Sequence, residues 1–106
     1  MMEFKREIKF LNEVSAPING EIRNNDLGAS ILQLDVSGTG FEIEVEGLVS
    51  HDGEFRKVAA VSDATYDTSL SIKQEGFYKV DISGYRAYKL NLISATSPVT
   101  CIGLEV

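Results

Sequence analysis

The sequence predicts an all-β protein: an antiparallel β-sandwich of about eight strands, comparable in size to an immunoglobulin-like or jelly-roll domain. Three observations predict this fold class. Hydrophobic and polar residues alternate along most of the chain, turn-forming residues gather between the alternating runs, and the runs recur at intervals of roughly 8–12 residues. The 106 residues suit a single domain, in which we expect 1–30 to be the less regular segment.

The N-terminal segment predicts a strand over 4–11. Phe4, Ile8 and Phe10 would share one face of that strand, because side chains two residues apart point the same way. A helix is the alternative, and its buried face would contain hydrophobic residues three or four apart, namely Phe4, Ile8, Leu11 and Val14. The next residues, 15–30, are rich in turn-forming types and predict a loop around one short strand.

The remaining strands are predicted from alternation. They are expected over 20–23, 30–37, 41–49, 55–61, 68–73, 77–82, 86–93 and 99–105. The clearest is the strand over 41–49, in which Phe41, Ile43 and Val45 point to one face. Glutamate occupies the intervening positions, so this strand has a hydrophobic inner face and an acidic outer face.

Two later strands are assigned inner and outer faces in the same way. In the strand over 77–82, Val80 is expected inside and Phe77 outside. In the last strand, hydrophobicity predicts Ile102, Leu104 and Val106 inside, and Thr100, Gly103 and Glu105 outside.

Turn chemistry separates the strands. Residues 37–40, Ser-Gly-Thr-Gly, predict a tight hairpin between the strands on either side. Asp52 and Gly53 predict a second hairpin of type I′, because that turn requires positive φ at both central residues.

Composition excludes several function classes. The net charge of −6 disfavours binding to nucleic acid, which requires clustered Lys and Arg. No stretch approaches the roughly 20 apolar residues of a membrane helix, and the N-terminus lacks the apolar centre of a signal peptide. The single Cys101 cannot form an internal disulfide, and the single His51 provides too few ligands for a typical zinc site.

The acidic face over Glu42, Glu44 and Glu46 is the most conspicuous polar feature. Its carboxylates are spaced about 6.6–7 Å apart along the strand, a distance that is compatible with a glycosidase-like acid pair. A solvated face with cross-strand lysine partners is the interpretation we favour, and Lys79 and Lys89 are the expected partners.

Other chemistry-bearing residues predict no catalytic or metal site. Cys101 lies in an apolar strand, where cysteine behaves as a small hydrophobe, and His51 lies beside a turn. Asp52, Asp63 and Asp67 lie in or near loops but lack the regular spacing of a calcium-binding loop. We therefore expect no enzyme activity and no cofactor.

Two groups of residues are candidate contacts to other proteins. The first group is Phe77, expected to point outward next to polar neighbours, and Tyr85, expected to be exposed near a corner. Tyr66 is also expected to be exposed near a corner, where its ring could stack on a sugar. The second group is the basic N-terminal cluster, Phe4, Lys5, Arg6 and Lys9. This cluster could dock on an acidic neighbour, or it could protect a strand edge.

The order of motifs resembles a family of small β-sandwich proteins found in tailed bacteriophages and prophages. The matching segments are LQLDVSGTG (32–40), FEIEVEGLVSHDG (41–53), FRKVAAV (55–61), GFYKVDISG (76–84) and YKLNLISATSPVTCIGLEV (88–106). The match is collinear, and GFYKVDISG is its most distinctive motif. The resemblance implies a virion component of the head-decoration, head-fibre or tail-associated type.

The sequence thus leads to two hypotheses. The first is a non-enzymatic virion protein, made in the bacterial cytoplasm, that binds other virion proteins and further copies of itself. The second is a module that binds carbohydrate or a cell surface, which would require two or three exposed aromatic residues close together.

Overall fold

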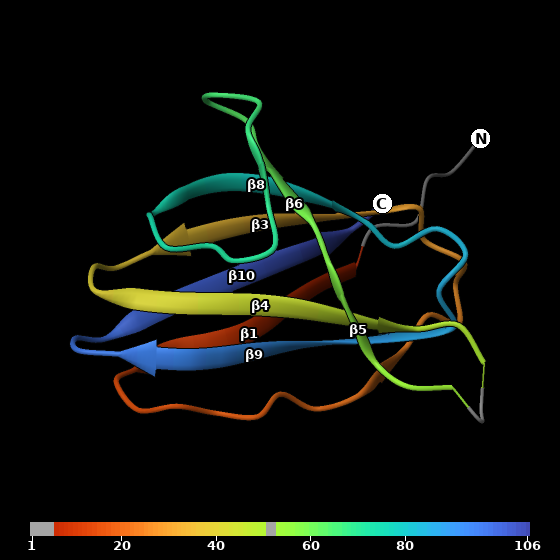
Figure 1. The fold of residues 1–106 in the computed structure, drawn as a ribbon, viewed down its shortest axis with the longest axis horizontal. Helices are drawn as coiled ribbons and strands as arrows, with labels where there is room; N and C mark the ends of the chain where they lie inside the picture. The colour runs from red at the N-terminus through yellow and green to blue at the C-terminus, as the bar shows by residue number, and fades with distance from the viewer. Residues whose placement is uncertain (1–5, 51–52) are drawn as a thin grey trace.

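The chain forms two antiparallel β-sheets that enclose the hydrophobic core between them (Figure 1). This computed structural model describes residues 6–50 and 53–106. Its strands are β1 (Arg6–Val14), β2 (Arg23–Asn24), β3 (Ile31–Ser37), β4 (Phe41–Leu48), β5 (Arg56–Val58), β6 (Ala60–Ser62), β7 (Thr68–Ser69), β8 (Gly76–Asp81), β9 (Ala87–Ala95) and β10 (Val99–Glu105). The larger sheet has the order β1-β10-β3-β8-β6-β7 and the smaller one β2-β9-β4-β5. The predicted all-β sandwich is confirmed.

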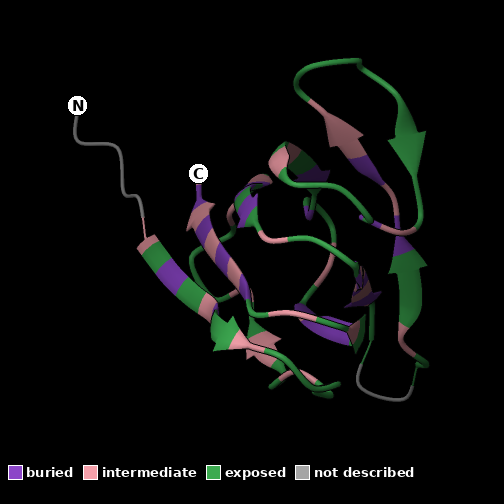
Figure 2. Cartoon of the chain, turned by 90° about the vertical axis from the view of Figure 1, so that its left-hand side faces the viewer, coloured by how far each residue is buried: buried purple, intermediate pink, exposed green. Residues whose placement is uncertain are grey.

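The described residues include no helix long and apolar enough to cross a membrane. The hydrophobic core lies between the two sheets. Figure 2 shows how burial changes from one residue to the next along single strands. Leu32, Leu34 and Val36 of β3 are buried, whereas the residues between them are exposed. Strands that are buried on one face and exposed on the other produce this period of two, so the predicted alternation is confirmed for β3, β4 and β8.

β1 is a strand, as predicted, and the irregularities in its pairing explain why its hydrophobic residues also fit a helix. Two irregularities interrupt its pairing with β10, between Lys9 and Leu11 and between Leu11 and Val14. Each adds one residue to β1 relative to its partner. Ile8, Leu11 and Val14 therefore pack inward although they are three residues apart, which is a helix-like spacing. Glu13, within the second bulge, has a φ of 53°.

The strand predicted over 55–61 is two strands in different sheets. β5 pairs with β4 in the smaller sheet, and β6 pairs with β8 in the larger one. Val58 and Ala60 on either side of the break are both buried, so the chain passes from one sheet to the other at Ala59 without leaving the core. Hydrophobicity is continuous across the break, which is why the sequence predicted one strand.

The hairpin predicted at 37–40 is wrong. β3 and β4 lie in different sheets, so these residues form a corner between the sheets. The left-handed φ values of Gly38 and Gly40 permit the sharp change of direction. Thr96 holds the corner by donating its backbone N–H to the carbonyl of Gly40 at 2.9 Å. Turn residues signal a reversal of the chain but not the sheet that the next strand enters.

The predicted strand over 68–73 is also shorter than expected. Only β7, Thr68–Ser69, joins the larger sheet, whereas Ile72 forms an isolated bridge with Ile43 of β4 in the smaller sheet. The predicted turn residue Asp52 lies outside the described residues, although β4 and β5 on either side of it pair as an antiparallel hairpin.

The faces predicted for β10 are reversed. The residues that are buried are Val99, Cys101, Gly103 and Glu105, and those at the outer positions are Thr100, Ile102 and Leu104. Gly103 faces inward because the ring of Phe10 occupies the space beside it: a Cβ at Gly103 would lie 2.4 Å from Cε2 of Phe10. Glu105 faces inward because it has two polar partners in the core, described below. Hydrophobicity alone could not reveal either reason.

The assignment of faces has a direct test at Val80, which is 0% exposed. We expect Val80→Asp to abolish folding, because it places a carboxylate in the core without a partner. The matched control is Lys79→Asp, which introduces the same residue at the adjacent, exposed position. Circular dichroism melting curves should show no cooperative transition for Val80→Asp and a near-normal one for Lys79→Asp. Similar curves for the two variants would mean that the faces of β8 are wrongly assigned.

Candidate interaction surface

The outer face of the larger sheet has apolar side chains near its centre. Phe77 of β8 is 62% exposed, and Ile102 and Leu104 of β10 are partly exposed nearby. We call this surface the large-sheet face. It comprises the outward residues of four adjacent strands, Glu7, Lys9, Ile102, Leu104, Gln33, Asp35, Phe77 and Lys79. A hollow of about 280 Å³ lies over its centre and is lined by Phe77, Ile102 and Leu104, among others.

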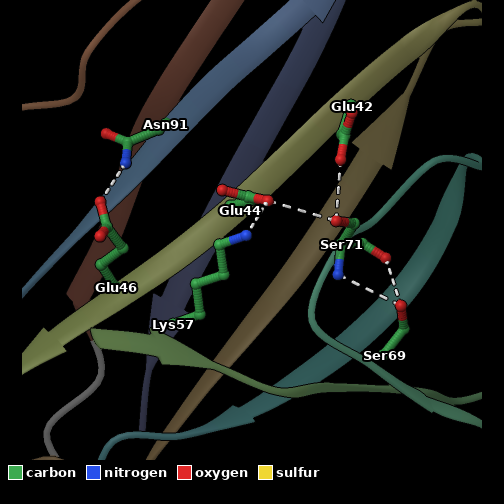
Figure 3. A network of polar contacts seen from close by, with 7 residues as sticks. All are labelled: Glu42, Glu44, Glu46, Lys57, Ser69, Ser71 and Asn91. Carbon is green, nitrogen blue, oxygen red and sulfur yellow. Dashed lines mark hydrogen bonds and ion pairs between the residues drawn. The ribbon is translucent and has the colours of Figure 1, made fainter.

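The outer face of the smaller sheet is different, because its acids are paired within the chain (Figure 3). Lys57 of β5 lies 2.9 Å from Oε2 of Glu44. Ser71 donates its hydroxyl to Oε2 of Glu42 at 2.9 Å, and Asn91 donates its amide to Oε1 of Glu46 at 2.6 Å. The three glutamates lie on the outer face as predicted, and all are partly buried beneath these partners.

One predicted partner of these acids is right and one is wrong. Lys89 of β9 lies 3.8 Å from Glu46 and 4.9 Å from the centre of the Phe55 ring. Lys79 belongs to β8 in the other sheet, so it lies on the large-sheet face. Lys57 takes the place that was predicted for Lys79, and its hydrogen bond to Glu44 raises the pKa of Lys57. The acids form a cross-strand polar network rather than an isolated pair.

A buried acid connects the two sheets at the end of β10. Glu105 is only 2% exposed, and its carboxylate accepts hydrogen bonds from Nε of Arg6 and from the Tyr88 hydroxyl, the latter at 2.7 Å. Burial opposes the charge, but the two hydrogen bonds and the charges of Arg6 and Arg23 outweigh burial, so the pKa of Glu105 is lowered. Burial and the hydrogen bond to Glu105 raise the pKa of Tyr88.

The four residues of the predicted N-terminal contact cluster do not share one environment. Phe4 and Lys5 lie outside the described residues, as does His51. Arg6 binds Glu105, so its guanidinium has a structural partner, whereas Lys9 is exposed on the large-sheet face. The structure therefore does not bring Arg6 and Lys9 together in one site.

The aromatic residues that the sequence predicts to be exposed differ in their actual exposure. Tyr66 is 79% exposed and Phe77 points outward, both as predicted. The expected exposure of Tyr85 is wrong: its side chain is partly buried and packs against the core. Its ring covers Gly47 so closely that a Cβ at Gly47 would lie 2.4 Å from Cδ1 of Tyr85. A neighbouring strand that lacks a side chain at this point provides the space for the ring.

The Cys101 thiol and the possible metal ligands are the remaining groups with potential chemistry. Cys101 is buried, and burial raises the pKa of its thiol to about 12, so it is protonated at neutral pH. Over residues 6–50 and 53–106, no three His, Cys, Asp or Glu side chains are grouped in a way that could hold a metal ion.

Sequence reasoning missed Ile102 and Leu104 as surface residues. The signal that could have identified them is Gly103, because a glycine between two hydrophobic residues in a strand often marks a close approach of another group. That approach is the Phe10 ring, which fixes Gly103 inside and turns both neighbours outside.

Comparison with known proteins places the fold among prophage-derived proteins. The chain aligns with the crystal structure of the SPBc2 prophage-derived protein YomS with a TM-score of 0.84 and 22% identity, over 96% of this chain and 92% of YomS. It aligns with the PBSX exported protein XepA with a TM-score of 0.80 and 23% identity, over 99% of this chain and 39% of XepA. No protein-family model and no curated protein matches the sequence. The likeness establishes a shared fold.

The buried acid gives a testable dependence of stability on pH. Because the pKa of Glu105 lies below its ordinary value of 4.5, its stabilising contribution is present above about pH 4.5 and is lost as pH falls through the lowered pKa. We expect Glu105→Gln to lower the free energy of unfolding by about 2 kcal/mol at pH 7 and by less at pH 3, since it removes one charge from a buried pair.

Urea unfolding followed by circular dichroism at both pH values measures this difference. Glu7→Gln, at an exposed position of β1, is the control and should leave both values within about 0.5 kcal/mol of the original. An equal loss of stability at pH 7 and pH 3 for Glu105→Gln would show that the charge of Glu105 does not contribute.

Proposed function

We propose that this chain is a non-enzymatic structural protein of a phage or prophage virion. In this role it decorates the head, belongs to a head fibre or is associated with the tail, and it acts in many copies through protein–protein contacts. The observation that carries the proposal is the large-sheet face, where Phe77 is 62% exposed beside Ile102 and Leu104. Exposed apolar residues rimmed by charged ones are typical of protein-binding surfaces.

The fold supports a phage origin. YomS is described as prophage-derived and XepA as an exported protein of PBSX, and this chain shares the fold of the first over nearly its whole length. The chain spans 39% of XepA, so only a part of that protein corresponds to it. The collinear motifs found in the sequence favour the same kind of protein.

The use of the chain's reactive groups supports a structural role. Cys101 is buried, and the carboxylate of Glu105 accepts hydrogen bonds from Arg6 and Tyr88. The glutamates that could have formed a catalytic pair accept hydrogen bonds or ion pairs from their neighbours. These groups stabilise the sandwich, and the exposed apolar residues remain for contact with other proteins.

The mechanism would be passive. A rigid two-sheet sandwich presents one apolar face, and many weak contacts on a symmetric particle add up because each bound copy raises the effective concentration of the next contact. Such a protein contributes stability to the particle without transforming a substrate.

The proposal is tested by following the chain into particles. A tagged copy is expressed in the bacterium that carries the prophage, phage production is induced, and particles are purified on a density gradient. We expect the chain to band with the particles and to be visible at a repeated position by immunogold labelling. Phe77→Ser should reduce incorporation at least about fivefold while leaving the melting curve unchanged, because Phe77 is exposed.

Recovery of the chain only in the particle-free fractions would contradict the proposal. The alternative function, a carbohydrate- or cell-surface-binding module, would use Tyr66 and Phe77, the strongly exposed aromatic residues of the described chain. Binding to a glycan array or to whole cells that is lost on Tyr66→Ala would favour that alternative.

A further inference from the structure

The large-sheet face is organised in two rows that run across the strands. The registers of β1, β10, β3 and β8 place directly opposed residues side by side. The first row is Lys9, Ile102, Asp35 and Phe77. The second row, two residues further along each strand, is Glu7, Leu104, Gln33 and Lys79. The rows are about 7 Å apart, and neighbours within a row are about 4.8 Å apart.

The two rows are complementary to each other. A two-fold axis that lies between them, in the plane of contact and perpendicular to the strands, would bring each strand opposite the same strand of a second copy and exchange the rows. The facing pairs would be Lys9 with Glu7, Ile102 with Leu104, Asp35 with Gln33, and Phe77 with Lys79. These are an ion pair, an apolar contact, a hydrogen bond and a cation–π contact.

A two-fold axis parallel to the strands gives a poorer match at the centre of the face. It would still pair Glu7 with Lys79 and Lys9 with Phe77 at the ends of the rows. At the centre, however, it would place Ile102 opposite Asp35 and Leu104 opposite Gln33, so each apolar residue would remove water from a polar group without replacing its hydrogen bonds. The pattern of side chains therefore selects one orientation of the second copy.

We propose that the large-sheet face binds a second copy of this chain, related by the two-fold axis perpendicular to the strands. In this dimer β10 packs against β10 of the second copy, and each contact occurs twice. The crossing angle of about 30° that is usual for packed sheets moves the end contacts by only about 4 Å, which lysine and glutamate side chains can span.

The charges on this face are available for such contacts. Among residues 6–50 and 53–106, Glu7, Lys9, Asp35 and Lys79 have no ion-pair partner, in contrast to Glu44 and Glu46 of the smaller sheet. The hollow over Ile102 and Leu104 offers space that side chains of a second copy could fill. A contact of two rows across four strands is smaller than a standard stable interface, so we expect weak, reversible association with dissociation constants of about 1–100 μM.

The inference deepens the proposed function, since it names a second copy of the chain as the partner of this face. It rests on the proposed function in one respect: a virion protein is present in many copies on one particle, which brings such copies together. Failure of the two ideas can be distinguished. A monomeric chain that still bands with particles would overturn the dimer alone, and a dimer that never enters particles would overturn the virion role alone.

The dimer is tested by exchanging charges at positions 7 and 9. Sedimentation equilibrium from 1 to 500 μM (about the range that brackets the expected affinity) should show a concentration-dependent shift from 11.6 kDa to twice that mass. Lys9→Glu alone, or Glu7→Lys alone, turns two attractive contacts into two repulsive ones, and each should weaken association at least about tenfold. The double variant with both changes should regain most of the original affinity.

Mixing the two single variants provides the sharpest test. In a mixed dimer, the acid introduced at position 9 faces the lysine introduced at position 7, and the original Glu7 faces the original Lys9. Association should therefore return on mixing, although each variant alone is monomeric at the same concentration. The matched controls are Lys73→Glu and Glu21→Lys, which make the same changes of charge at exposed positions outside the large-sheet face.

The apolar part of the contact is tested by Phe77→Ser, which should also weaken association at least about tenfold while leaving the melting curve unchanged. A chain that remains monomeric at 500 μM (well above the expected range) would overturn the inference. So would a dimer that responds equally to the control variants, or single variants that fail to associate on mixing.

Discussion

The direction in which β10 faces is the constraint on which the surface of this protein depends. Glu105 is held between the sheets by Arg6 and Tyr88, and Gly103 is held inside by the ring of Phe10. Because successive side chains of a strand point to opposite faces, these two contacts oblige Ile102 and Leu104 to lie outside. A buried ionic contact of Glu105 thus places two apolar side chains on the surface one and three residues away, about 3 and 10 Å along the same strand.

The two outer faces show how the same alternation can give surfaces with different uses. On the smaller sheet, each glutamate of β4 has a partner within the chain, so this face is satisfied without another molecule. On the larger sheet, charged side chains surround apolar ones in rows whose order is complementary to itself. The difference between the faces, rather than the net charge of −6, is the basis of the proposed contact with a second copy of the chain.

The similarity to two prophage-derived structures at 22% and 23% identity is consistent with how this fold is specified. A sandwich requires buried residues at alternate positions and turns at suitable intervals, and many different sequences satisfy both requirements. The outer residues are not constrained in this way. The large-sheet face is therefore a property of this chain's own sequence, and the shared fold does not imply it.

The sequence by itself determined the all-β class, most strand positions and the inner faces of β3, β4 and β8, because a period of two depends only on neighbouring residues. Only the tertiary structure decided which sheet each strand joins: the corner at 37–40 and the crossing at Ala59 read as a hairpin and a single strand. The faces of β10 were likewise decided by residues far away in the chain, Arg6, Phe10 and Tyr88. Long-range partners determine burial whenever a glycine or a charged residue lies in the core, and local hydrophobicity contains no information about them.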